Sequence, residues 1–159
     1  MPFIIDGYNL LHFIRKSDED FESITDVALC HILDKFLKLV RDSGQLVFDG
    51  IGTPDKTGFD NMTNIEVIFS GRDIEADTVI ENKISANTAP KRLNVVSSDR
   101  RLRRAARSRK AIPVKCDVFW RNVQKQFSRK KSPAEPRQKR QGLTEAETKQ
   151  WLEYFDLDQ

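Results

Sequence analysis

The stretch Phe3-Ile4-Ile5-Asp6-Gly7-Tyr8-Asn9-Leu10-Leu11 determines how the rest of this chain can be organised. Its first three apolar residues predict a short buried strand, and the Asp6-Gly7 pair is a typical strand breaker. Asp6 and Asn9 therefore lie at a strand end, which is a rigid platform on which a carboxylate suits a hard metal ion. Taken alone, the same residues are equally compatible with an Asp-Gly turn and a capping Asn.

A second stretch, Leu93-Asn94-Val95-Val96-Ser97-Ser98-Asp99, has the same form. It is an apolar run that ends in an acid and is followed by a helix-like segment. Two strand-end acids about 90 residues apart suggest a parallel sheet, whose carboxyl edge gathers functional groups at the topological switch point. We therefore expect Asp6 and Asp99 to end neighbouring strands.

Strands alternate with helices through residue 127, which predicts an α/β fold with a doubly wound parallel sheet and right-handed crossovers. Apolar runs predict strands at 3–5, 45–48, 64–70, 93–98 and 112–115, and periodic patterns predict helices at 24–41, 75–86, 100–110 and 117–127. Segments 13–22 and 50–63 are predicted to be loops. Gly44 is predicted to stop the helix before it, and Pro113 is more tolerable in an edge strand.

The C-terminal part of the chain is predicted to be an appendage to this core. Residues 128–142 form a basic, proline-containing linker, and residues 143–159 form a terminal helix. Thr144 and Glu147 have capping-box spacing. Trp151, Leu152 and Phe155 give the helix a small apolar face that docks either on this chain or on a partner.

Charge divides the chain into three blocks, although its formal net charge is only +3. Residues 1–90 hold 8 Lys/Arg and 16 Asp/Glu, residues 91–140 hold 18 and 3, and residues 141–159 hold 1 and 5. The middle block, with a net charge of +15, is more basic than solubility requires. A basic block beside an acid-rich half suits a protein that handles a polyanion through metal ions.

Further acids are expected at the same sheet edge. Asp77 and Glu81 are four apart on a predicted helix, so both face the same way, and Glu75 and Asp49 lie nearby in the predicted fold. An all-oxygen cluster suits Mg²⁺ or Mn²⁺ rather than zinc, and its expected chemistry is metal-assisted phosphodiester hydrolysis. The two histidines, His12 and His31, have no partner at ligand spacing and are expected to be solvated or at the core edge.

Several other classes are disfavoured. The sequence has no Walker A motif, no G-x-G-x-x-G and no Gly-x-Ser-x-Gly elbow, and Tyr8 stands where an aspartyl phosphatase usually has its second acid. No apolar run approaches 18 residues and no signal peptide is evident. Cys30 and Cys116 are too few to staple a secreted fold, so we expect both to be reduced and buried in a cytoplasmic protein.

The segments Ile4-Ile5-Asp6-Gly7-Tyr8-Asn9-Leu10, Glu75-Ala76-Asp77 and Val95-Val96-Ser97-Ser98-Asp99 resemble the NYN domains of the PIN-like nuclease superfamily, and the YacP-like bacterial family among them. The resemblance covers most of the chain, including the basic helix and the terminal Trp-containing helix. It implies a PIN-like three-layer α/β/α sandwich and a metal-dependent ribonuclease that, as in some YacP-like members, acts on ribosome-associated mRNA. Carried over by motif, Asp6, Asn9, Asp77 and Asp99 form the acidic centre. The usual fourth PIN acid is not obvious, and Asp117, in roughly the right region, suits a helix cap better.

The predicted helix 100–110 concentrates positive charge directly after Asp99. Four arginines fall within about 100° of arc on a helix of 3.6 residues per turn, with Leu102 and Ala105 facing the sheet. Arg101 and Lys110 widen the positive face. The predicted phosphate-binding residues are Arg100, Arg101, Arg103, Arg104, Arg107 and Lys110. Without an aromatic ladder, we infer recognition of the RNA backbone rather than of bases.

Three functions remain open at this stage. The leading one is a cytoplasmic Mg²⁺- or Mn²⁺-dependent endoribonuclease comprising residues 1–127, with the ribosome as a partner. The second is a non-catalytic RNA- or ribosome-binding module with a PIN-like fold. The third is a protein-interaction domain whose acidic edge is incidental. The sequence also leaves open whether Asp49, Glu75, Glu81 or Asp117 joins the acidic centre.

Overall fold

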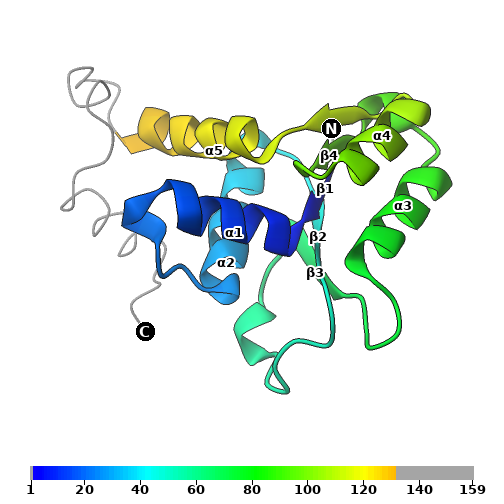
Figure 1. Ribbon diagram of the computed structural model, residues 1–159. Coiled ribbons are helices and arrows are strands. Elements are labelled where there is room, and N and C mark those ends of the chain that lie inside the picture. Colours follow the sequence, from blue (N-terminus) through cyan, green and yellow to red (C-terminus); the bar gives the residue numbers. More distant parts are fainter. Residues whose placement is uncertain (1, 132–159) are drawn as a thin grey trace.

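A five-stranded parallel sheet forms the centre of the molecule, in a computed structural model that describes residues 2–131 (Figure 1). The strand order is β3-β2-β1-β4-β5, and every neighbouring pair is parallel. The strands are β1 (Phe3–Asp6), β2 (Gly44–Phe48), β3 (Ile65–Phe69), β4 (Asn94–Val96) and β5 (Ile112–Val114). The predicted α/β class and parallel sheet are confirmed, and β5, which contains Pro113, is an edge strand as expected.

Five α-helices cover the two faces of the sheet and make a three-layer sandwich. They are α1 (Gly7–Ser17), α2 (Asp26–Val40), α3 (Ala76–Ala86), α4 (Arg100–Ser108) and α5 (Cys116–Lys131). Helices α1, α2 and α5 lie on one side of the sheet, and α3 and α4 on the other (Figure 1). Short 3₁₀ turns η1 (Glu19–Phe21), η2 (Thr57–Phe59) and η3 (Pro90–Arg92) lie in the connections.

The central strand β1 marks the point where the strand order reverses. The chain runs outward from β1 to β2 and β3, then returns to place β4 on the other side of β1. Ile5 pairs with Leu46 on β2 and with Val96 on β4. The predicted adjacency of the first and fourth strands is confirmed, and the segments after β1 and β4 therefore meet at one sheet edge.

The core is aliphatic on both faces of the sheet, and its buried phenylalanines lie on the face covered by α1, α2 and α5. Phe36 of α2 packs edge-on against Phe119 of α5, with ring centroids 5.5 Å apart. The apolar stripe predicted for α2 is buried, with Leu29, Ile32, Leu33, Phe36 and Leu37 all at 0% exposure. Burial of this stripe stabilises the packing of α2 on the sheet. Each large side chain removed from water contributes about 1.5–3 kcal/mol to the free energy of folding.

The prediction of a loop at 13–22 was wrong, because α1 begins directly after Asp6 and continues to Ser17. Leu10, Leu11 and Ile14 are buried at helical spacing, so packing on the sheet outweighs the Asp-Gly breaker signal. Gly7 permits this tight start: a Cβ there would lie 2.5 Å from Phe48 Cδ1. The end of the segment forms η1, which buries Phe21.

Three helix boundaries also differ from prediction. Helix α2 ends at Val40 and is capped by Arg41, which has a left-handed φ of 57°, whereas Gly44 begins β2. Helix α5 begins at Cys116, so Asp117 lies inside its first turn rather than at the cap, and the helix continues past residue 127 to Lys131. Among residues 2–131, no helix is long and apolar enough to cross a membrane. The predicted linker beyond α5 and the terminal helix 143–159 lie outside the described residues.

Candidate active site at the carboxyl edge of the sheet

Asp6 is the last residue of β1 and one of two buried polar or charged side chains in the described part of the chain. Only 7% of Asp6 is exposed. The pKa of its carboxyl is raised from 3.8 to about 6, mainly by burial and to a smaller extent by the charges of Asp77 and Asp99, whereas a hydrogen bond from Ser97 opposes the shift. A buried acid with a raised pKa in this position is typical of a functional carboxylate.

Ser97, the other buried polar residue, connects the two motifs that end β1 and β4. Its hydroxyl donates to Asp6 Oδ2 at 3.0 Å and accepts from the backbone N–H of Asp99 at 3.1 Å. Asp99 is the N-cap of α4, and its Oδ1 accepts from the backbone N–H of Arg101 at 2.8 Å. The two strand-end acids are therefore held in one hydrogen-bonded unit.

Asn9 joins the same unit from the first turn of α1. Its Oδ1 accepts from the backbone N–H of Ser98 at 2.9 Å and from Cys116 Sγ at 3.1 Å. The backbone donor identifies the side-chain atom as oxygen, since an N–H can only donate to it. In this arrangement Asn9 positions the turn that carries Asp99, and its amide oxygen is already engaged by two donors.

Asp77 approaches from the first turn of α3, on the other face of the sheet. Partial burial raises the pKa of its carboxyl, as does the charge of Asp99, whereas the nearby Arg101 lowers it. The predicted common direction of Asp77 and Glu81 is confirmed, since both lie against the Arg101 guanidinium. Asp6, Asp77 and Asp99 are thus brought within electrostatic reach of one another.

The remaining acids have other contacts. Glu75 and Glu81 form ion pairs with Arg101 at 3.2 and 2.5 Å. Asp49 Oδ1 accepts from the backbone N–H of Ala76 at 2.9 Å, so it satisfies a free donor at the start of α3. Within residues 2–131, no three His, Cys, Asp or Glu side chains form a group that could hold a metal ion in this conformation.

The basic residues predicted on α4 separate into three environments. Arg100, Arg104, Arg107 and Lys110 are exposed, as expected of a phosphate-binding face. Arg101 turns toward the acids of α3 instead. Arg103 is partly buried, and its Nη1 atom is buried without a hydrogen-bond partner. Leu102 is fully buried and Ala105 packs partly buried against the same core, as predicted, and Ala106 is fully buried beside them.

Three features of the site were missed from the sequence. The sequence predictions assign no bonding partner to Ser97, only a buried, reduced thiol to Cys116, and only phosphate binding to Arg101. Both cysteines are free and buried, as predicted. Of these contacts, only that of Ser97 is indicated by the local sequence. A serine two residues before an acid can accept a hydrogen bond from the backbone N–H of that acid. The other two contacts depend on residues distant in sequence.

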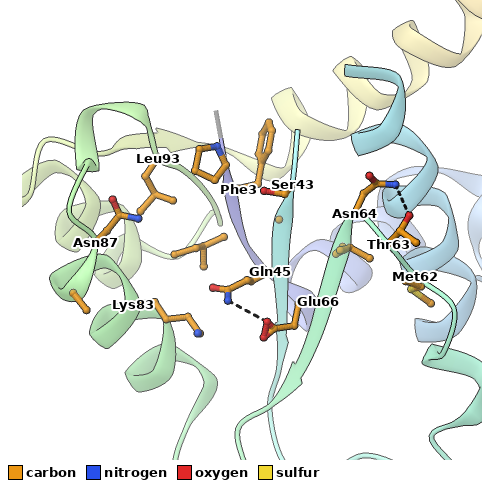
Figure 2. Close-up of a pocket in the computed structure, with 15 residues that line it drawn as sticks. Phe3, Ser43, Gln45, Met62, Thr63, Asn64, Glu66, Lys83, Asn87 and Leu93 are labelled. Atoms are coloured by element: carbon orange, nitrogen blue, oxygen red, sulfur yellow. Dashed lines mark hydrogen bonds between the residues drawn. The ribbon is translucent and has the colours of Figure 1, made fainter. Parts of the chain in front are cut away.

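A hollow with a volume of about 700 Å³ lies away from these acids, at the amino ends of the strands (Figure 2). Phe3 and Leu93 form part of its lining, and Gln45 donates to Glu66 across it at 3.4 Å. None of the predicted catalytic residues contributes to it. This hollow is therefore separate from the candidate site.

Comparison with known proteins identifies the family of this chain and agrees with its fold. The family model described as "YacP-like NYN domain" matches residues 3–156. The crystal structure of Rae1 (YacP) from Bacillus subtilis is similar with a TM-score of 0.64 and 21% identity, over 98% of this chain and 92% of that chain. A tryptophan-to-leucine mutant of the same protein gives a TM-score of 0.62 and 19% identity, over 99% of both chains. At these identities, the two structures show a shared fold alone. No curated protein matches the chain.

Proposed function

This chain belongs to the YacP-like NYN domain family, and from that premise we propose that it is a metal-dependent endoribonuclease that hydrolyses RNA phosphodiester bonds. The family is of the nuclease type, which implies an RNA substrate. The observation that carries the proposal is the hydrogen-bonded unit of Asp6, Ser97 and Asp99 at the switch point of the sheet, with Asp77 facing it.

The chemistry of the donor set fits Mg²⁺ or Mn²⁺. Asp6, Asp77 and Asp99 offer only carboxylate oxygens, which hard divalent cations prefer. Burial, and then the charges of Asp77 and Asp99, raise the pKa of Asp6, and a cation bound beside the three carboxylates would favour its ionised form. These three residues would hold the metal. A small rearrangement would be needed, because they are not arranged as a complete ligand set in this conformation. A bound divalent cation supplies Lewis-acid catalysis to phosphodiester hydrolysis.

The other residues of the site would orient the substrate and the acids. Ser97 and Asn9 hold the turn before α4 and so fix the position of Asp99. Exposed Arg100, Arg104 and Arg107 would bind backbone phosphates on either side of the cleaved bond. Contacts to phosphates alone would give affinity for RNA without recognition of its bases.

The test is cleavage of a labelled single-stranded RNA by the purified protein with Mn²⁺, Mg²⁺ or EDTA. Asp6→Asn and Asp99→Asn should each reduce cleavage by orders of magnitude while remaining folded. Asp20→Asn, an exposed carboxylate on η1, is the matched control and should retain wild-type activity. Wild-type turnover in both site mutants would contradict the proposal.

One observation favours a second candidate, a non-catalytic RNA-binding module. Arg101 already neutralises part of the acidic cluster, and no complete ligand set is present among residues 2–131. This candidate predicts salt-sensitive RNA binding without metal-dependent cleavage. The cleavage experiment above separates the two, provided that binding is measured on the same samples.

The resemblance to YacP-like proteins supports two finer proposals. The first is that the RNA is mRNA on the ribosome, which co-sedimentation of the protein with ribosomes at low and high salt would test. The second is a cytoplasmic location, which agrees with the free, buried Cys30 and Cys116.

A further inference from the structure

Arg101 directs its guanidinium at the acids of α3, although it belongs to the helix whose other exposed arginines face solvent. We propose that Arg101 is a positioning residue of the acidic centre: its guanidinium, tethered by Glu75 and Glu81, is a built-in counter-cation that stabilises the metal-free protein and lowers its affinity for the divalent cation. This inference rests on the proposed metal site.

The geometry of Arg101 is that of a clamp rather than of a loose surface pair. Its Nε donates to Glu81 Oε1 at 2.6 Å, and its Nη1 donates to Glu75 Oε2 at 3.2 Å. Its Nη2 lies 2.5 Å from Glu81 Oε1 and 3.4 Å from Thr78 Oγ1. All three nitrogens of the side chain are therefore engaged by α3, a fork geometry that lysine cannot reproduce.

The clamp leaves Asp77 free while placing positive charge beside it. Asp77 Oδ2 is 3.9 Å from Arg101 Nη1, beyond hydrogen-bond distance. Glu75 and Glu81 thus hold the guanidinium, and Asp77 receives only its electrostatic effect. Asp99 contacts the backbone of Arg101 instead, since its Oδ1 accepts from the Arg101 N–H at 2.8 Å.

A purely structural role for Arg101 would be modest. An ion pair with a 46%-exposed arginine side chain is worth little to folding in water. Its position gives it a larger consequence, because Asp77, one of the acids proposed to hold the metal, lies 3.9 Å from its Nη1. A divalent cation that binds beside Asp77 must approach the positive charge of Arg101. In the metal-free protein, that charge offsets the repulsion among Glu75, Asp77 and Glu81.

The consequence can be measured without RNA. Removing one positive charge from the site should tighten Mn²⁺ binding on the order of tenfold, given solvent-screened Coulomb interactions at this exposure. It should also lower the melting temperature in EDTA, because Glu75, Asp77 and Glu81 then repel one another without compensation. Mn²⁺ should restore that temperature, so the stabilisation by metal should be larger than in the wild type.

The experiment is calorimetric titration of MnCl₂ into the full-length wild type, Arg101→Gln, Arg101→Lys and Arg104→Gln, with melting curves in EDTA and in Mn²⁺. Arg104→Gln removes the same charge from an exposed position on α4 and should bind Mn²⁺ as the wild type does. Arg101→Lys keeps the charge but loses the fork, so its Mn²⁺ affinity should stay within about threefold of wild type.

The outcomes separate this inference from the proposed function. If the wild type does not bind Mn²⁺ at all, the proposed metal site fails. If the wild type binds Mn²⁺ and Arg101→Gln binds it no more tightly than Arg104→Gln does, only the counter-cation inference is overturned. Tighter binding by Arg101→Gln alone, with Arg101→Lys near wild type, supports it.

Discussion

The Ser97 hydroxyl donates a 3.0 Å hydrogen bond to Asp6 Oδ2, joining residues 91 positions apart at the ends of β4 and β1. The Ser97 hydroxyl oxygen also accepts from the backbone N–H of Asp99. One buried hydroxyl thereby ties together two of the three acids proposed to hold the metal.

Removing this hydroxyl should destabilise the protein. Ser97→Ala leaves the buried Asp6 carboxylate without that donor and the Asp99 N–H without its acceptor, which should cost about 1–3 kcal/mol in the free energy of unfolding. Urea denaturation followed by circular dichroism measures this. Ser108→Ala, at the exposed end of α4, should change stability by less than about 0.5 kcal/mol. Equal stability of the two variants would contradict the role given to Ser97.

The raised pKa of Asp6 predicts how stability changes with pH. The folded state binds the Asp6 proton more tightly than the unfolded state does, so this contribution to stability is complete below pH 3.8 and is lost as pH rises through about 6. Ionised Asp6 then costs about 3 kcal/mol at neutral pH, by the usual conversion of a pKa shift. Asp6→Asn removes that cost.

Melting curves in EDTA would check the prediction for Asp6. Asp6→Asn should melt above the wild type at pH 7.5, and the difference should shrink towards pH 4.5. Asp20→Asn is the control and should follow the wild type at both values. A stability gain from Asp6→Asn that is the same at both pH values would show that relief of ionisation is not its cause.

The exposed arginines of α4 should govern RNA affinity. Replacing Arg100, Arg104 and Arg107 with Ala should weaken binding to all single-stranded RNA sequences alike. It should also flatten the plot of log affinity against log salt by roughly two units, at about 0.7 per lost phosphate contact. Fluorescence anisotropy in Ca²⁺ measures binding while cleavage is suppressed.

The matched control for this triple variant removes the same charge elsewhere. Lys16, Lys38 and Lys91 are exposed on α1, α2 and η3, and their joint replacement with Ala should leave the salt slope unchanged. If both triple variants shift the slope equally, net charge rather than the α4 face determines affinity.

The start of α1 should tolerate no side chain. In Gly7→Ala the new Cβ would meet Phe48 Cδ1 at 2.5 Å and the Val47 carbonyl oxygen at 2.9 Å, so the helix must shift away from β2. We expect a loss of about 1–3 kcal/mol in the free energy of unfolding, and reduced cleavage because Asp6 and Asn9 flank this residue. Gly58→Ala, whose Cβ would meet only Val27 methyl groups at 3.1 Å, should be milder. A loss in Gly7→Ala no larger than that in Gly58→Ala would contradict the steric argument.

Most elements of the fold, and the sheet edge where the site lies, can be predicted from the sequence. Apolar runs and helical periodicity report burial on one face, a local property, so the five strands and the helices α2 to α5 were predictable within a few residues. Strand alternation with helices then required a parallel sheet, and the two strand-end acids required a common edge. Helix α1 escaped prediction because an Asp-Gly pair normally breaks structure, and only its packing against Phe48 and the sheet shows that it does not.

The partners of the side chains in hydrogen bonds and ion pairs become visible only in the folded protein. That Asn9 bonds Ser98 and Cys116, and that Arg101 turns from the basic face to Glu75 and Glu81, depends on residues 20 to 107 positions apart. The helical pattern of α4 gives every arginine a direction around the helix axis, but it does not show what lies opposite. The physical reason is that hydrogen bonds and ion pairs are short-ranged, so their partners are fixed by how α3 and α4 pack on the sheet rather than by the local pattern of either helix.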